Sequence, residues 1–174
     1  MEKLLLLDIN GVLCYRTTED ISGELVIKLP KCSVALRPGY QIFLDFCYYR
    51  YKIAFFSSTT YQNANDILET LLTPNQKKRT LFRWFRDRTH YDPDTNDHST
   101  IKLLSDVFDN PVVNSYRQFT SRNTLLCDDS PSKIRFNNPN NIVLINPFEG
   151  DSNDRTLFEL MNIIPSRFDY IQSS

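Results

Sequence analysis

The stretch LLLLDINGVLCYR, residues 4–16, decides the fold that this sequence predicts. Its four consecutive leucines form a short apolar run without alternation, which is typical of a parallel strand buried on both faces. The run ends at Asp8, and Gly11 suits a tight turn after the strand. The stretch therefore predicts a central strand with a carboxylate at its carboxyl end, followed two residues later by the amide of Asn10.

The rest of the chain alternates short apolar runs with segments of helical periodicity. Such alternation indicates an α/β fold with a mostly parallel central sheet. Two β-like pieces on either side of Pro30-Lys31 predict a small hairpin or flap. Further strands are expected at 53–56, 80–85, 124–127 and 142–145, helices at about 38–51, 63–72, 100–108 and 155–163, and the flap at 24–29 with 33–36.

The composition predicts one globular domain over residues 1–174. Lys and Arg total 20 against 21 Asp and Glu, so no general attraction to nucleic acid is expected. The longest apolar runs are too short to span a membrane, and MEKLLLLD lacks the features of a secretory signal. An intracellular protein of the nucleus or cytoplasm is expected, with reduced thiols at Cys14, Cys32, Cys47 and Cys127.

Polar residues follow three of the expected strands: Asp8 the first, Ser57 the second, and the pair Asp128-Asp129 the third. The carboxyl ends of parallel strands meet at one edge of the sheet, where ligands bind in such folds. Each residue alone has a structural alternative, an Asp as a turn former and Ser57 as a helix N-cap. Adjacent carboxylates, however, repel one another unless a cation lies between them. The shared edge therefore favours a functional site.

Phosphoryl transfer is chemistry that these residues can perform. A carboxylate nucleophile at Asp8 needs the charges of its site neutralised, which Mg²⁺ held by Asp128 and Asp129 would do. Ser57 can donate a hydrogen bond to phosphoryl oxygens. Lys102, in STIKLLSD, can supply a further positive charge, and its alternative is a solvated lysine on a helix. Receiver domains of two-component signalling use similar groups, but their acidic pair follows the first strand, so the order here excludes them.

The order of these segments resembles that of a known family. DINGV resembles the first motif of the haloacid-dehalogenase superfamily, Asp-x-Asp-x-Thr/Val. More closely, the chain resembles the FCP/SCP-type (NLI-interacting-factor-like) phosphatases, which act on the C-terminal domain of RNA polymerase II and on other phosphoserine proteins. The matching segments are LRPGYQIFLDF (36–46), AFFSSTTYQNA (54–64), LFR (81–83), TIKLLS (100–105), LLCDDSPSKIRFNNPNNIVLINPF (125–148) and GDSNDRTLFELMNII (150–164).

This resemblance implies a Mg²⁺-dependent phosphatase for phosphoserine and phosphothreonine proteins. It also implies a Rossmann-like, three-layer core with a small inserted element somewhere in residues 73–99. Asp8 would be the nucleophile, Ser57 would bind the phosphate, and Lys102 would hold the two together. The implied metal ligands are Asp8, the backbone carbonyl of Asn10, Asp128, and Asp129 either nearby or through water.

Asn10 departs from the family, which has a second Asp at this position. In the resemblance, that Asp protonates the leaving oxygen and later activates water, whereas an amide cannot transfer a proton. General acid–base catalysis contributes roughly 10²–10⁴-fold, so the substitution should impair turnover by about that factor. Three interpretations stay open: a phosphatase that stalls as a phospho-aspartyl intermediate, a pseudophosphatase that serves as a binding scaffold, or an engineered substrate trap. Asn10-Gly11 is also a deamidation-prone dipeptide, and deamidation would restore the acid.

Two further segments are candidates for binding. The basic and aromatic stretch Lys77–Arg88 could hold an acidic partner, a phosphopeptide or RNA, or it could be a solvated face of an edge strand. The near-zero net charge favours a phosphopeptide or an acidic partner over nucleic acid. The loop from Asp92 begins like a calcium loop, but Asp97 stands at the sixth position and Leu103 at the twelfth. It is therefore expected to be a polar surface loop.

Overall fold

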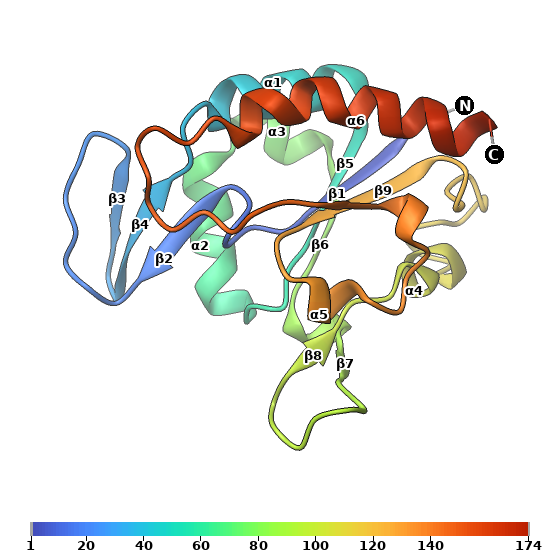
Figure 1. Ribbon diagram of the computed structural model, residues 1–174, viewed down its shortest axis with the longest axis horizontal. Helices are drawn as coiled ribbons and strands as arrows, with labels where there is room; N and C mark the ends of the chain where they lie inside the picture. The colour runs from blue at the N-terminus through green and yellow to red at the C-terminus, as the bar shows by residue number, and fades with distance from the viewer. Residues whose placement is uncertain (1, 174) are drawn as a thin grey trace.

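A computed structural model describes residues 2–173, and a five-stranded parallel sheet forms its centre (Figure 1). The strands follow the order β10-β9-β1-β5-β6. All four leucines of β1 are 0% exposed, as expected for a strand that is covered on both faces. The predicted α/β fold is confirmed, with strands at β1 (Leu4–Leu7), β5 (Lys52–Phe56), β6 (Thr80–Trp84), β9 (Thr124–Asp128) and β10 (Ile142–Leu144).

Helices cover both faces of this sheet, so that the leucines of β1 alternate between two cores. Leu5 and Leu7 pack in a core with α1, α2 and α6, whereas Leu4 and Leu6 pack in a second core with α4 and α5. Figure 1 shows α1 and α6 above the sheet and α4 and α5 below it. The helices are α1 (Tyr40–Arg50), α2 (Tyr61–Leu71), α3 (Pro74–Arg79), α4 (Leu104–Asp109), α5 (Pro131–Ile134) and α6 (Thr156–Ser173). Within residues 2–173, no helix has the length and apolarity to cross a membrane.

The flap is a three-stranded antiparallel sheet that follows β1 directly. Its strands are β2 (Cys14–Thr17), β3 (Val26–Leu29) and β4 (Cys32–Leu36), in the order β2-β4-β3. Leu29 pairs with Cys32, so Pro30 and Lys31 form the tight turn between β3 and β4. The predicted hairpin is confirmed, and β2 is an additional strand that joins it to the first strand of the central sheet.

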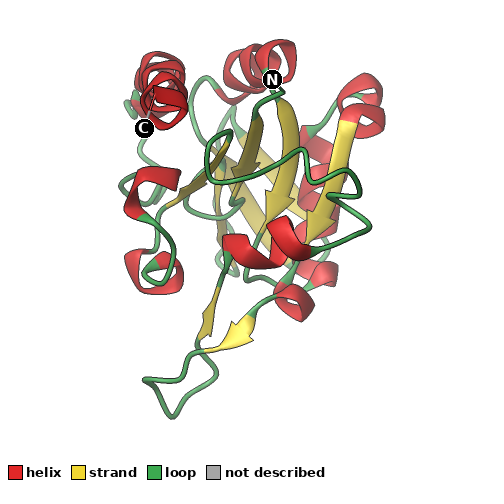
Figure 2. Ribbon diagram, turned by 90° about the vertical axis from the view of Figure 1, so that its right-hand side faces the viewer, coloured by secondary structure: helices red, strands yellow, loops and turns green. Residues whose placement is uncertain are grey.

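The segment where an inserted element was expected, 73–99, contains α3, β6 and the beginning of a small hairpin. This hairpin joins β7 (His90–Tyr91) to β8 (Thr100–Ile101) and projects from the body of the molecule (Figure 2). The helix predicted from residue 100 begins only at Leu104, so its first residues were assigned wrongly. The last helix runs to Ser173, well beyond the predicted end at 163, and contains Pro165.

Candidate active site

Two acidic residues lie side by side where the two central strands end. Asp8 follows β1 and is 3% exposed, while Asp128 ends β9 and is 0% exposed. The parallel register places Leu7 beside Cys127, so the next residue on each strand reaches the same edge. The backbone N–H of Asp8 donates to the Cys127 carbonyl at 3.0 Å, which holds the two strand ends together.

Lys102 joins these two carboxylates from the segment between β8 and α4. Its Nζ lies 3.0 Å from Asp8 Oδ2 and 2.6 Å from Asp128 Oδ2, and its side chain is 0% exposed. The alternative of a solvated helix lysine was therefore wrong. Burial alone would lower the pKa of Lys102, but the charges of Asp8 and Asp128 outweigh it and raise the pKa, so Lys102 is an ammonium.

Burial has the opposite effect on the carboxyl groups of Asp128 and Asp129. It raises the pKa of Asp128 to about 6; the charge of Lys102 opposes this shift and that of Asp8 adds to it. Burial and then the charge of Asp8 also raise the pKa of Asp129. Three carboxyl groups around one ammonium leave negative charge in excess, which is a setting that favours a bound cation.

Asn137 positions the backbone that follows Lys102. Its side-chain amide donates to the Lys102 carbonyl at 2.8 Å and accepts from the Leu104 N–H at 2.7 Å. In addition, the backbone N–H of Lys102 donates to the Lys133 carbonyl at 2.7 Å. Asn137 belongs to the run NNPNN within the family-like segment 125–148, but nothing in this run indicates which Asn holds the lysine. The role of Asn137 was therefore missed.

The geometry of the acidic residues suits a metal ion with oxygen ligands. One ligand atom each from Asp8, Asp128 and Asp129 lies within 4.8 Å of the others, and no other such cluster occurs among residues 2–173. Gly11, at φ +83°, makes room for this arrangement, because a Cβ there would lie 2.1 Å from Asp129 Oδ2. An all-carboxylate set is what a hard cation such as Mg²⁺ prefers, so the residues present fit that ion.

Asn10 connects the site to the flap. Its side-chain Oδ1 accepts a hydrogen bond of 2.8 Å from the backbone N–H of Arg16, on β2. A carboxylate oxygen can accept the same hydrogen bond, so the local structure is compatible with either Asn or Asp at this position. Asn in place of Asp at position 10 therefore removes a proton-transferring group from the site and requires no change in the backbone conformation.

Ser57 lies at the end of β5, the other neighbour of β1. It is 1% exposed, and its Oγ accepts from the backbone N–H of Thr59 at 3.3 Å. The N-cap of α2 is Thr60, so Ser57 is not the N-cap that the structural alternative proposed. A hydroxyl group that already accepts this hydrogen bond still has its own hydrogen to donate.

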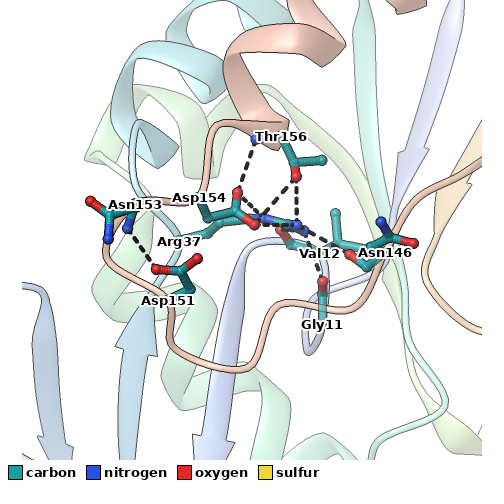
Figure 3. Close-up of polar contacts among 8 residues, drawn as sticks. All are labelled: Gly11, Val12, Arg37, Asn146, Asp151, Asn153, Asp154 and Thr156. Carbon is teal, nitrogen blue, oxygen red and sulfur yellow. Dashed lines mark hydrogen bonds and ion pairs between the residues drawn. The ribbon is translucent and has the colours of Figure 1, made fainter.

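Arg37 ties the turn after Asp8 to the segment before α6 (Figure 3). It is 1% exposed, and its Nε and Nη2 donate to the two carboxylate oxygens of Asp154, each at 2.8 Å. Burial alone would raise the pKa of Asp154, but hydrogen bonds and charge from Arg37 outweigh it and hold this pKa below its usual range. Arg37 also donates to the carbonyls of Gly11, Val12 and Asn146 and to Thr156 Oγ1.

Five of the six basic residues of Lys77–Arg88 have partners within the chain, and Lys78 is the exception among the described contacts. Lys77 and Arg83 both pair with Glu69, at 2.8 and 2.6 Å, and the Arg88 guanidinium lies 5.9 Å from the centre of the Trp84 ring. Arg79 donates to the Tyr48 carbonyl and Arg86 to the His98 carbonyl. The segment therefore distributes its cations over several contacts and does not gather them into one patch.

The loop that begins like a calcium site has its carboxylates engaged by an arginine. Arg135 Nη2 lies 2.6 Å from Asp92 Oδ1 and 2.7 Å from Asp94 Oδ2. These contacts hold the β7–β8 hairpin against the segment after α5 and agree with the expected polar loop. All four cysteines are free thiols, as expected.

Comparison with known proteins gives a family match along almost the whole chain. The model of the family NIF, described as NLI interacting factor-like phosphatase, matches residues 3–170. An uncharacterized FCP1 homology domain-containing protein of Schizosaccharomyces pombe is 23% identical over 155 residues, which are 86% of this chain and 63% of that protein. The mitochondrial import inner membrane translocase subunit TIM50 of Gibberella zeae is 24% identical over 132 residues, 76% of this chain and 21% of that protein.

Solved structures share the fold. A structure of a variant of fission yeast RNA polymerase II CTD phosphatase Fcp1, bound to beryllium fluoride, has a TM-score of 0.58 at 15% identity and covers 99% of this chain. A second structure, of Fcp1 as an essential RNA polymerase II CTD phosphatase, has a TM-score of 0.58 at 14% identity and covers 98%. The chain spans 52% and 49% of those two chains, and less than two thirds of each protein named above.

Proposed function

The chain belongs to the family of NLI interacting factor-like phosphatases, and we propose that it is a Mg²⁺-dependent phosphatase-type domain for phosphoserine and phosphothreonine in proteins. The buried triad carries this proposal: Lys102 Nζ lies within 3.0 Å of Asp8 Oδ2 and 2.6 Å of Asp128 Oδ2. A carboxylate held by a buried ammonium, beside two further carboxylates, is an arrangement suited to attack on phosphorus.

Asp8 is the nucleophile in this proposal. Its carboxylate oxygen forms a bond to phosphorus while the bond from phosphorus to the seryl or threonyl oxygen breaks, which leaves an aspartyl phosphate. Lys102 fixes the orientation of Asp8 and places positive charge beside the transferred group. Ser57 donates its hydroxyl hydrogen to a phosphoryl oxygen, and water then hydrolyses the aspartyl phosphate.

Mg²⁺ would be held by Asp8, Asp128, the backbone carbonyl of Asn10, and Asp129 directly or through water. Within residues 2–173 no hydrogen bond is directed to the Asn10 carbonyl, so its lone pairs are available to an ion. When bound, the ion neutralises negative charge on the phosphoryl group and on the surrounding carboxylates.

Asn10 impairs both halves of this reaction. The leaving oxygen receives no proton from an amide, and the attacking water gives up none to it. The first step keeps its nucleophile, its ammonium and its metal ligands, whereas the second step depends on activated water. The aspartyl phosphate is therefore expected to accumulate, with overall turnover reduced roughly 10²–10⁴-fold.

A catalytically inactive scaffold is the second candidate, and the amide at position 10 is the observation that favours it. TIM50, to which the chain is similar, is by description a translocase subunit. In this alternative the same edge would bind a phosphorylated protein or an acidic partner without turnover. The basic stretch at Lys77–Arg88 is a weaker surface for such a partner, because Lys77 and Arg83 already pair with Glu69. The nuclear or cytoplasmic location stays a prediction.

Phosphatase activity on an aryl phosphate with Mg²⁺ separates the two candidates. Three proteins are compared: the chain itself, Asn10→Asp, and Asn10→Asp combined with Asp8→Asn. We expect Asn10→Asp to gain about 10²-fold or more, because it restores the acid, and we expect the added Asp8→Asn to abolish the gain. An Asn10→Asp protein that folds, binds Mg²⁺ and stays inert would overturn the phosphatase proposal and favour the scaffold.

Deamidation of Asn10 must be controlled in this experiment. The reaction requires the backbone nitrogen of Gly11 to attack the Asn10 side chain, with loss of ammonia. In the fold, Gly11 N–H donates to the Cys14 carbonyl at 2.7 Å, and Asn10 Oδ1 is held by Arg16. Both contacts oppose the attack, so folded protein is expected to retain Asn10, and mass spectrometry of each preparation checks this.

A further inference from the structure

A pocket lies between the flap and the first turns of α2. Its volume is about 220 Å³, and it is lined by Arg16 of β2, the β3–β4 turn with Lys31, and Gln62, Asn63 and Asp66 of α2. The backbone of Arg16 is the same one that donates to Asn10 Oδ1 at 2.8 Å. Arg16 therefore connects this pocket to Asn10, two residues after Asp8.

The guanidinium of Arg16 has unused hydrogen-bonding capacity. Its Nε is buried without a partner, and its Nη2 makes only a long contact of 3.4 Å with Asn63 Oδ1. Nη1 makes no hydrogen bond within residues 2–173, so its N–H groups can donate to a ligand oxygen. The planar fork of an arginine matches the paired oxygens of a carboxylate or a phosphate.

The charges around the pocket favour an anion. Among the residues that the structure describes, neither Arg16 nor Lys31 pairs with a carboxylate. The N-terminal turn of α2 adds the positive end of its helix dipole, and the side chain of Thr60 does not cap it. Asp66 is the one acidic side chain in the lining, and its negative charge partly offsets the positive charges of Arg16 and Lys31.

We propose that this pocket is an anion subsite, in which Arg16 and Lys31 bind an acidic group one or two residues away from the phosphorylated residue of the substrate. The inference rests on the proposed function, because it assumes that a phosphorylated residue occupies the site at Asp8. The anionic group is the carboxylate of an Asp or Glu or the phosphate of a second modified residue. Its role is specificity: it selects substrates whose phosphorylation site lies in an acidic sequence.

Equilibrium binding to the Asp8→Asn protein with Mg²⁺ tests the subsite without turnover. The probes are a phosphoserine peptide with alanine on both sides, the same peptide with Glu at each flanking position, and the same with a second phosphoserine. We expect an acidic flank to strengthen binding about tenfold through a charge-assisted hydrogen bond. Comparison of the Glu and phosphoserine peptides identifies the favoured anion.

Variants of the pocket residues test which of them cause the preference for acidic flanks. Arg16→Gln should remove the preference for acidic flanks, Arg16→Lys should retain part of it, and Asp66→Asn should increase it. Lys28→Gln is the matched control, because Lys28 is a cation of the same flap sheet that pairs with Asp20 and does not line the pocket. Lys31→Gln provides a second test of the pocket should Arg16→Gln fail to fold.

The outcomes separate this inference from the proposed function. Equal binding of acidic and neutral peptides, absence of binding by any of them, or a preference that survives both Arg16→Gln and Lys31→Gln would overturn the subsite. Aryl phosphate has no flanking residue, so its hydrolysis by the Asn10→Asp protein tests only the chemistry at Asp8. Activity there without a flank preference rejects the subsite alone, and inactivity there rejects the phosphatase.

Discussion

Lys102 and Arg16 are two cations near the same sheet edge, and they differ in burial and in their carboxylate partners. Lys102 is 0% exposed and pairs with two buried carboxylates, whereas Arg16 is partly exposed, pairs with no carboxylate among the described residues, and has a buried Nε without a partner. A cation that the fold neutralises is part of the framework of the site. A cation that the fold leaves without a counter-charge is suited to a group that arrives with a ligand.

The largest effect is expected for Lys102→Met. Removal of the ammonium leaves Asp8 and Asp128 buried next to each other without their counter-charge, so we expect the free energy of unfolding to fall by about 3–5 kcal/mol. Urea denaturation in the presence of a chelator measures this change. Arg16→Gln is the comparison, and it should change the same quantity by less than about 0.5 kcal/mol because its charge has no internal partner. Equal losses for the two variants would remove the distinction between these cations.

Arg37→Met should have the next largest effect. The guanidinium is buried and satisfies both oxygens of Asp154 together with several carbonyls, but Asp154 is partly exposed and can regain water. We therefore expect a loss of about 2–3 kcal/mol in the free energy of unfolding, measured by urea denaturation. Asp154→Asn keeps hydrogen bonds to Arg37, so its free energy of unfolding should fall by less than that of Arg37→Met. An Arg37→Met protein as stable as the parent would show that these contacts are not needed to hold the turn after Asp8.

The central sheet could be predicted from the sequence because its signals are local. Leu4–Leu7 is an apolar run, and the polar residues after the strands identify the edge at which Asp8 and Asp128 meet. The cluster of carboxylates then follows from the parallel register, which brings these two residues side by side. The roles in catalysis and metal binding stay predictions for every residue of the site: Asp8, Asn10, Ser57, Lys102, Asp128 and Asp129.

Other features depend on contacts between distant segments and have no local signal. Arg37 reaches Asp154 across 117 residues, and Asn137 reaches Lys102 across 35. The β2 strand, CYRT, has no apolar run and exists because it pairs with β4. The last helix continues through Pro165, which favours a helix end by itself. Burial of Ile164 and Phe168 on either side of the proline explains why the helix continues.

Gly11→Ala should have a smaller effect on stability and a separate effect on the proposed metal site. At φ +83° an alanine is strained, which costs about 1–2 kcal/mol, and its Cβ would lie 2.1 Å from Asp129 Oδ2. Asp129 must therefore move, so we also expect weaker Mg²⁺ binding by calorimetry. Gly23→Ala is the control, because a Cβ there meets nothing closer than 3.5 Å. Unchanged Mg²⁺ affinity in Gly11→Ala would argue against Asp129 as a ligand.

The smallest effect concerns pH and separates charges that the fold pairs from charges that it leaves free. Arg37 holds the pKa of Asp154 below its usual range, so folding favours the ionised form of this carboxyl group. Its contribution to stability is complete above the unfolded pKa of about 3.9 and is lost as the pH falls through the lower folded pKa. The difference in urea midpoint between the parent and Asp154→Asn should therefore shrink as the pH is lowered from about 5 to about 2.

Arg16→Gln provides the contrast in the same pH series. Because Arg16 has no carboxylate partner, the difference in urea midpoint between Arg16→Gln and the parent should stay constant over this pH range. A constant difference for Asp154→Asn would mean that the pair with Arg37 does not favour the ionised carboxylate. A pH-dependent difference for Arg16→Gln would mean that Arg16 interacts with a titrating group of the chain, and its charge would then not be reserved for a ligand.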